Sequence, residues 1–361
     1  MPDAQQTVDP EPDAPAAPSE VDGSGEEATG PRPRRRRGRR IALIVLLLVV
    51  VVVVLLVGGG VGGGFFYLRS VDSRIERVDA FQDVPQEARP PVAAKGAMNI
   101  MILGSDSRDP ENTTGSRSDT IIVAHLPKDR KSAELVSIPR DTWVHVPRSK
   151  DGQHGDRDAK INAAYAWGGV PLMVQTVEQF TGVRIDHVAI VDFAGFKDII
   201  DAIGGVDIDS EREFTSIHPP FRKFAKGVQH MDGETALDWS RQRKQFPDGD
   251  FARIRHQQQV IRAILDRAAS GGILTNPGKL NDFVKASSAA VSVDKGMSLL
   301  DMAGDLRNLR GGNLFFFTSP TKGTGRVGTE SVVFPDPAKV RTFYDAVRRD
   351  AVKEIVGGAQ G

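Results

Sequence analysis

The feature that most constrains this chain is the uncharged apolar run Ile41–Leu68, which directly follows the basic segment Pro31–Arg40. A bilayer core needs about 20 apolar residues in a helix, so this run is long enough to span one. Cations beside a span favour the cytoplasmic side, so we expect residues 1–40 inside the cell and the rest outside. A cleaved signal peptide is the alternative, but its apolar core is usually about 7–15 residues long. The sequence therefore predicts a single-pass protein of the cell membrane with a transmembrane helix over residues 41–68.

Composition divides the remaining sequence into a tail, a linker and one domain. Residues 1–40 begin with a Pro-, Ala- and acid-rich stretch without aromatic rings, which predicts a disordered tail that ends in the basic run. Beside a membrane span, that run favours membrane over nucleic acid as a partner. Residues 69–97 have mixed charge and a Pro-rich end, which indicates a linker, and residues 98–361 contain no second linker. The chain has no cysteine, which excludes disulfides and thiolate metal sites.

Apolar runs of strand length and of helix length alternate beyond residue 98. The strands are predicted over Asn99–Gly104, Asp119–Pro127, Glu134–Arg140, Asp186–Phe193 and Asn313–Pro320. The helices are predicted over Pro171–Gly182, Phe193–Gly205, Phe251–Gly272 and Pro337–Val352. Strands interleaved with helices indicate an α/β fold, which we expect to be a three-layer α-β-α sandwich around a mixed central sheet.

Charged residues stand where several predicted strands begin or end. The short turn Lys128–Ser132 makes the second and third strands an antiparallel hairpin. Asp119 opens one strand of that hairpin and Arg140 closes the other, so the two residues should share one sheet edge. If the first strand is antiparallel to the second, this edge gathers a larger set: Asp106, Arg108, Arg117, Asp119, Arg140 and Asp141.

The helix that starts near Asp250 has a polar beginning and an apolar continuation on one face. At about 100° per residue, Asp250, Arg253 and Gln257 share a face. The same face continues with Ile254, Ile261 and Ile264, whereas Arg255, His256, Gln259 and Arg262 point elsewhere. Such a face suits a phosphate at the mouth of a site and a lipid below it. The alternative is a partly buried helix in which Arg253 simply pairs with Asp250.

Arginine and aspartate recur in five short clusters, namely Gly104–Arg108, Arg117–Asp119, Pro139–Asp141, Arg241–Arg243 and Asp250–Gln257. Guanidinium groups bind phosphate oxygens through two hydrogen bonds, and carboxylates hold the Mg²⁺ that accompanies phosphates. Each cluster alone could be an ordinary turn or a surface ion pair worth about 1 kcal/mol or less. Their convergence predicts a pyrophosphate site, and the membrane span suggests that the pyrophosphate belongs to a lipid. The sequence contains no P-loop, GxSxG or HExxH motif.

Several motifs resemble, in their order along the chain, the LytR-CpsA-Psr family of bacterial envelope proteins, in its actinobacterial form. They are ILGSDSR, GSRSDTIIVAHL, LVSIPRDTWV, KINAAYAWGG, DHVAIVDFAGFKDIIDAIGGVDI, LDWSRQRK and DGDFARIRHQQQVI, and they span about Asn99–Ile261. The resemblance implies a Mg²⁺-dependent phosphotransferase. It would move a glycopolymer with its phosphate from a polyprenyl-pyrophosphate carrier to peptidoglycan, at the muramic acid 6-hydroxyl, and release polyprenyl phosphate.

The resemblance also implies residue roles. Asp106 and Asp119 would be the carboxylates linked to Mg²⁺, or to Mn²⁺, and would form the catalytic centre with Arg117 and Arg140. The pyrophosphate site would comprise Arg108, Arg241, Arg243, Asp250, Arg253 and Gln257. For the polyprenyl tail, the apolar faces predict a pocket lined by some of the residues Val174, Val177, Phe193, Phe196, Ile261 and Ile264, although an ordinary core is the alternative. A lipid-pyrophosphate hydrolase and a non-catalytic sensor of lipid-linked precursors remain open as other functions.

Overall fold

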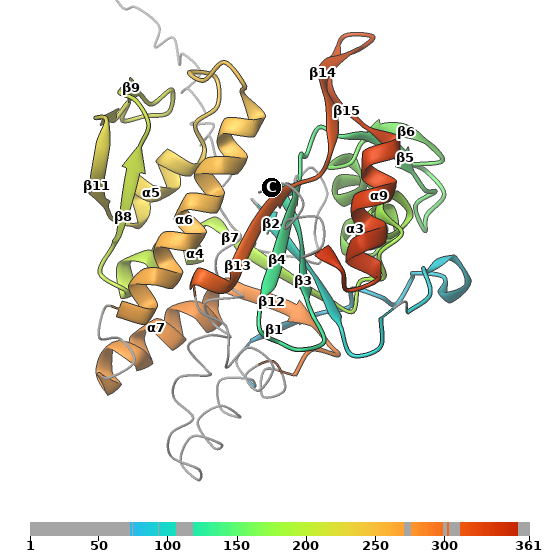
Figure 1. Ribbon diagram of the computed structural model, residues 1–361, viewed down its shortest axis with the longest axis horizontal. Coiled ribbons are helices and arrows are strands. Elements are labelled where there is room, and N and C mark those ends of the chain that lie inside the picture. The colour runs from blue at the N-terminus through green and yellow to red at the C-terminus, as the bar shows by residue number, and fades with distance from the viewer. Residues whose placement is uncertain are drawn as a thin grey trace, which may run out of the picture. The chain divides into compact units, whose positions relative to one another are not determined.

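The computed structural model of the chain describes residues 73, 75–92, 94–105, 118–270, 276–298, 302 and 311–352 (Figure 1). A seven-stranded sheet forms its centre, in the order β1-β12-β7-β2-β3-β4-β13. These strands are β1 (Glu76–Val78), β2 (Met98–Ser105), β3 (Ser118–Leu126), β4 (Ala133–Ile138), β7 (His187–Asp192), β12 (Val291–Asp294) and β13 (Leu314–Thr318). None of the described helices is both long enough and apolar enough to cross a bilayer, and the predicted span Ile41–Leu68 lies outside the described residues.

The sheet is mixed, as predicted. β3 pairs antiparallel with β2 and with β4, which confirms the predicted hairpin and its antiparallel first strand. β7 lies parallel to β2, β13 lies parallel to β4, and β12 runs antiparallel to β7. Every residue of β3 and of β4 is buried, because helices cover both faces of the sheet.

Helices cover the two faces of the sheet and make a three-layer sandwich (Figure 1). Alternate strand residues point to opposite faces, so Ile100 and Ile122 belong to one core and Met101 and Val123 to the other. The first core is covered by α4 (Phe193–Ala202), α5 (Gly233–Ser240), α6 (Asp250–Ser270) and α7 (Pro277–Ala290). The second core is covered by α3 (Ala163–Thr181) and α9 (Pro337–Arg348).

Helix α3 begins well before the predicted start at Pro171. Gly168 and Gly169 interrupt it with non-helical dihedral angles, and Gly169 has a φ of 64°, which favours glycine. The predicted helix corresponds to the segment after this kink, where proline is tolerated because the preceding turn supplies no regular helical hydrogen bond. Because of the kink, the part of α3 before it lies at the sheet edge and the part after it packs on the sheet.

Part of the predicted linker belongs to the folded domain. β1 extends the central sheet by pairing in parallel with β12, and Arg89 forms an ion pair of 2.8 Å with Glu178 of α3. The domain boundary predicted at residue 98 therefore lies too far along the chain. Residues 76–78 look polar in the sequence, which favoured a linker, but they form an edge strand.

Four two-stranded ribbons and two short 3-10 helices complete the described structure, and no sequence pattern predicted them. The ribbons pair β5 (Trp143–Val146) with β6 (Arg157–Lys160), β8 (Val206–Ser210) with β11 (Gly227–Met231), β9 (Phe214–Thr215) with β10 (Lys223–Phe224), and β14 (Thr321–Val327) with β15 (Glu330–Pro335). The 3-10 helices are η1 (Gln86–Ala88) and η2 (Gly311–Asn313).

Candidate functional site

The sheet edge where β3 begins and β4 ends carries a buried ion pair. The hairpin register places Ile121 opposite Ile138, and continuing it by two residues brings Asp119 opposite Arg140. The Arg140 guanidinium donates to Oδ1 of Asp119, and both residues are buried. β2 ends at the same edge, where Ser105 pairs with Ser118. The predicted convergence of Asp119 and Arg140 is therefore confirmed.

The first turns of α6 bring a second guanidinium to this edge. Arg253 is only 1% exposed, and its Nη2 lies 2.7 Å from Oδ1 of Asp250. The same Nη2 lies 3.4 Å from the Asp119 carbonyl oxygen. Arg243 approaches Asp250 from the preceding loop, with 3.8 Å between its Nη1 and Oδ1. The helix face predicted from the sequence therefore points at the sheet edge.

The buried charges of this cluster only partly compensate one another. Burial lowers the pKa of Arg253, and the Asp250 carboxylate only partly offsets that effect. Burial also acts to lower the pKa of Arg140, but the carboxylates of Asp119, Asp141 and Asp250 outweigh it and the net shift is upward. Both side chains remain cations at neutral pH, because arginine does not deprotonate in proteins.

Several buried polar atoms of the cluster have no hydrogen-bond partner among the described residues. They include Nε and Nη1 of Arg253, Oδ2 of Asp119 and the amide nitrogen of Gln257, which lies one helical turn beyond Arg253. A buried polar group without a partner costs about 1–3 kcal/mol, and more when it is charged. Donors and an acceptor left open side by side are typical of a site that binds a polar ligand.

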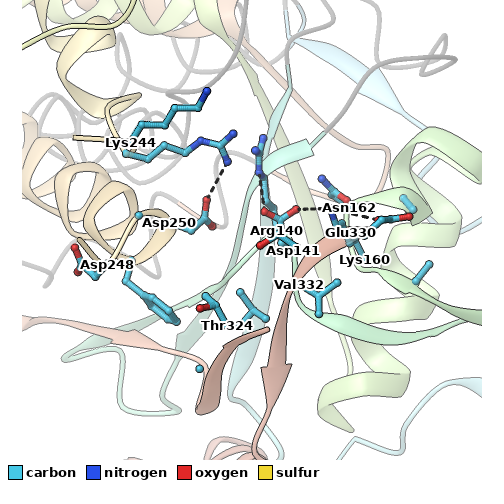
Figure 2. Close-up of a pocket in the computed structure, with 18 of the residues that line it drawn as sticks. Arg140, Asp141, Lys160, Asn162, Lys244, Asp248, Asp250, Thr324, Glu330 and Val332 are labelled. Carbon is cyan, nitrogen blue, oxygen red and sulfur yellow. Dashed lines mark ion pairs between the residues drawn. The ribbon is translucent and has the colours of Figure 1, made fainter. Parts of the chain in front are cut away.

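A cleft of ≈ 920 Å³ opens beside the cluster (Figure 2). One wall comprises Arg140 and Asp141 together with Lys160 and Asn162, and the other comprises the loop from Arg243 to Phe251. The hairpin β14–β15 contributes Gly323, Thr324 and Glu330–Val333. Lys160 bridges two acids, with 3.7 Å to Asp141 and 3.3 Å to Glu330. Figure 2 shows Arg140 and Lys160 facing Lys244 and Asp250 across the opening.

Sequence reasoning missed most residues of the cleft, and four polar examples are Lys160, Asn162, Lys244 and Glu330. The first three stand within motifs that resembled the family, KINAAYAWGG and LDWSRQRK, so those motifs contained a usable signal. Glu330 stands in none of them, because its hairpin reaches the cleft only through tertiary packing.

The remaining predicted site residues divide into two groups. Arg241 does not line the cleft, and its guanidinium lies 5.8 Å from the centre of the Phe193 ring. Asp106, Arg108 and Arg117 lie outside the described residues, so their roles remain predictions. His256, which the helical wheel directs away from the site, is buried between Trp239 and Phe246 at ring distances of 4.5 and 4.7 Å.

The six residues predicted for the lipid pocket divide between the two cores. Val174 and Val177 of α3 lie in the core on one face of the sheet. The other four residues, Phe193, Phe196, Ile261 and Ile264, lie in the core on the opposite face. One pocket cannot contain all six, because the sheet separates the two cores. A lipid role for the α4 and α6 residues remains a prediction.

The donor atoms at the sheet edge are compatible with Mg²⁺. The described residues contain no group of three or more His, Cys, Asp or Glu side chains that could hold a metal on their own. Mg²⁺ at phosphate sites is usually held by one or two carboxylates together with substrate oxygens and water. Oδ2 of Asp119 is a buried carboxylate oxygen without a described partner, and it fits that requirement.

Comparison with known proteins identifies relatives of this chain. LcpA, a cell wall biosynthesis protein of Corynebacterium glutamicum, is 33% identical over 306 residues, which cover 72% of this chain and 57% of LcpA. TagU of Bacillus mycoides, named a polyisoprenyl-teichoic acid–peptidoglycan teichoic acid transferase, is 41% identical over 181 residues, which cover 50% of this chain and 56% of TagU. The chain thus spans just over half the length of these two relatives.

A solved structure and a family model extend the comparison. The crystal structure of B. subtilis TagV superposes with a TM-score of 0.59 at 29% identity, over 72% of this chain and 98% of TagV. The sequence model of the LytR_cpsA_psr family matches residues 67–346, well over half of the 361-residue chain. This protein therefore belongs to the LytR-CpsA-Psr family.

Proposed function

We propose that this protein transfers a glycopolymer with its phosphate from a polyprenyl-pyrophosphate carrier to a hydroxyl of peptidoglycan and releases polyprenyl phosphate. The observation that carries the proposal is the buried guanidinium of Arg253. Its Nε and Nη1 have no described partner, and its ion-pair partner Asp250 lines the cleft. Guanidinium groups match phosphate oxygens in charge and geometry. The name of the relative TagU supports the substrate class, since it specifies a polyisoprenyl-linked polymer and peptidoglycan.

Positioning and charge neutralisation account for most of phosphoryl-transfer catalysis. Arg253 and Arg243 would hold the oxygens of the pyrophosphate, and Arg140 would keep Asp119 in place through their ion pair. The acceptor hydroxyl attacks the phosphorus that bears the glycan, and the bond to the bridging oxygen breaks, which releases polyprenyl phosphate. A carboxylate of the site that does not hold the metal accepts the hydroxyl proton.

Asp119, together with the predicted Asp106, would hold the Mg²⁺ of this site. The ion would supply positive charge to the phosphate oxygens as negative charge develops on the leaving group. Arginine and metal charge at such positions act strongly because a closed site contains little water.

The domain would work outside the cell, next to the membrane that holds its lipid substrate. The support is the predicted span Ile41–Leu68 and its basic flank, together with the cell wall names of the relatives. The polyprenyl tail would then enter from the bilayer, and the glycan would project toward the cell wall.

The experiment uses the purified full chain in nanodiscs with Mg²⁺. The donor is a polyprenyl-pyrophosphate glycan that carries a radiolabel in the phosphate next to the glycan, and the acceptor is peptidoglycan. We expect the label on peptidoglycan and unlabelled polyprenyl phosphate in the lipid fraction. Release of free glycan phosphate at equal rates with and without acceptor would instead identify a hydrolase. Donor binding without any turnover would identify a sensor.

A further inference from the structure

A short closed loop next to the Arg241–Arg243 segment presents apolar side chains to solvent. The loop, Ser216–Arg222, connects β9 to β10. Its ends are joined by a hydrogen bond of 2.8 Å from the Ser216 amide to the Arg222 carbonyl oxygen. The Phe221 amide donates to the His218 carbonyl at 2.7 Å, and Phe221 has a φ of 61°. A bulky residue rarely adopts that conformation.

The tip of this loop is apolar and exposed. Phe221 is 58% exposed and Ile217 is 40% exposed, and Pro219 and Pro220 between them are exposed as well. Single exposed apolar residues are common on soluble proteins and need no explanation. Here four apolar residues stand within five consecutive positions, and the closed loop holds them outward. They form a small apolar surface that an apolar partner would bury.

Cations follow this tip in the sequence, and the β9–β10 hairpin contains no carboxylate. Residues 214–231 contain Arg222, Lys223 and Lys226 but no Asp or Glu. Lys223 and Lys226 are exposed, and neither pairs with an acid among the described residues. An apolar tip within a basic surround is the pattern by which peripheral segments bind an anionic bilayer. A neutral or basic protein partner would not need these lysines.

The loop is hydrogen-bonded directly to the segment after α5 that carries the predicted phosphate ligands. Gln242 is fully buried, and its amide nitrogen donates to Oγ of Ser216 at 2.9 Å. Its Oε1 accepts from the Ile217 amide at 3.3 Å. Gln242 stands between Arg241 and Arg243 in sequence. Burial and then the charge of Arg241 lower the pKa of His218, so this side chain lies near the same cations.

We propose that the Ser216–Arg222 loop is a lipid-contacting element that seats the domain on an anionic phospholipid surface, with Ile217 and Phe221 among the acyl chains and Lys223 and Lys226 among the headgroups. The inference rests on the proposed function only in that a polyprenyl donor lies in such a surface. Through Gln242, the seated loop would hold the Arg241–Arg243 segment at the height of the donor's pyrophosphate.

Fluorescence quenching tests the contact directly. The chain has no cysteine, so Phe221→Cys and Ile217→Cys can each be labelled at one position with nitrobenzoxadiazole. The matched control is Lys131→Cys, an exposed site in the β3–β4 turn, at the end of these strands remote from Asp119 and Arg140. The labelled full chains enter nanodiscs of phosphatidylcholine and phosphatidylglycerol that contain lipids with doxyl groups on their acyl chains.

We expect strong quenching of the loop labels and little quenching of the control label. Replacing Lys223 and Lys226 by Gln should weaken the contact roughly fivefold per cation on anionic discs. Quenching of the Phe221 label no greater than that of the Lys131 label would overturn the proposal. Equal quenching on discs with and without phosphatidylglycerol would overturn the assignment to anionic lipid.

An activity measurement separates this proposal from the proposed function. The double variant Ile217→Ser, Phe221→Ser should transfer more slowly from a donor in nanodiscs but at the wild-type rate from a donor in detergent micelles. Equal losses of transfer rate in nanodiscs and in micelles would show that the loop acts on the active site and not on the membrane. If the wild type transfers nothing, the proposed function fails, whereas the quenching result still decides the lipid contact.

Discussion

Replacing Arg253 by Lys tests whether the buried guanidinium acts on substrate. Lys keeps the positive charge beside Asp250 but loses the planar fork whose Nη2 contacts both Asp250 and the Asp119 carbonyl. Lys is the sharper substitution, because Arg253→Ala would leave the carboxylate of Asp250 without its closest cation, and breaking a buried pair in this way costs about 3–5 kcal/mol. Arg255, two residues further on, provides the matched control.

The expected magnitudes differ because the two side chains differ in burial. Arg253 is 1% exposed, and removing one donor to a transition-state charge typically slows a reaction about 100- to 1000-fold. The Arg255 side chain is 47% exposed and pairs with Asp248 and Glu211 at the surface. Such surface pairs contribute about 1 kcal/mol or less to stability, and Lys keeps their charge, so Arg255→Lys should leave both Tm and rate close to the wild type.

The assay measures transfer by the full chain at several donor concentrations, with thermal unfolding of each variant as a check on folding. A loss in kcat at constant Tm for Arg253→Lys, with near wild-type rates for Arg255→Lys, is the expected outcome. Comparable losses in both variants would refute the assignment of the α6 face. A Tm that falls in parallel with the rate of Arg253→Lys would show that the residue serves the fold.

Three further outcomes are expected. Asp119→Asn should lower transfer at least about 100-fold and weaken its response to added Mg²⁺, whereas an unchanged rate at every Mg²⁺ concentration would exclude Asp119 from the metal site. Burial lowers the pKa of His256 from 6.5 to about 4, so the unfolded chain takes up a proton in this interval and the folded chain does not. The free energy of unfolding should therefore keep its highest value above pH 6.5 and fall by roughly 3 kcal/mol toward pH 4. Urea titrations of the wild type and of His256→Phe should differ in how steeply this free energy depends on pH. Protease added to spheroplasts should digest residues 98–361 and spare an N-terminal tag, and protection of the domain would reverse the predicted topology.

The sheet edge was predictable because local signals determine it. A five-residue turn between two apolar strands specifies an antiparallel hairpin, and the hairpin register then brings Asp119 and Arg140 together. Helical geometry alone placed Arg253 on the face of Asp250 and Arg255 on another face, and in the structure Arg253 is buried whereas Arg255 pairs at the surface. Both inferences needed only the spacing of residues within one element or between neighbouring elements.

The sequence could not assign the lipid pocket to one side, because amphipathic periodicity does not specify the face of the sheet. Val174 and Ile261 each stand on an apolar helix face, and the sequence offers no means of telling that α3 and α6 cover opposite sides. All of β3 is buried, so the sheet itself carries no polar face that would have excluded one side. The same limit applies to Glu330, which packs against Lys160 from a hairpin far along the chain.

The energetics of the buried cluster argue for a ligand more strongly than its composition does. A buried ion pair is seldom more stable than well-packed apolar residues of the same volume, so Arg253 and Asp250 are weakly explained by stability. The open Nε and Nη1 of Arg253 add a further cost, which the Asp119 carbonyl does not remove because it contacts only Nη2. An anion with several oxygens, placed against Arg253 and Arg243, would satisfy those donors and balance their charge. These costs support the proposal that the cluster is one half of a phosphate complex.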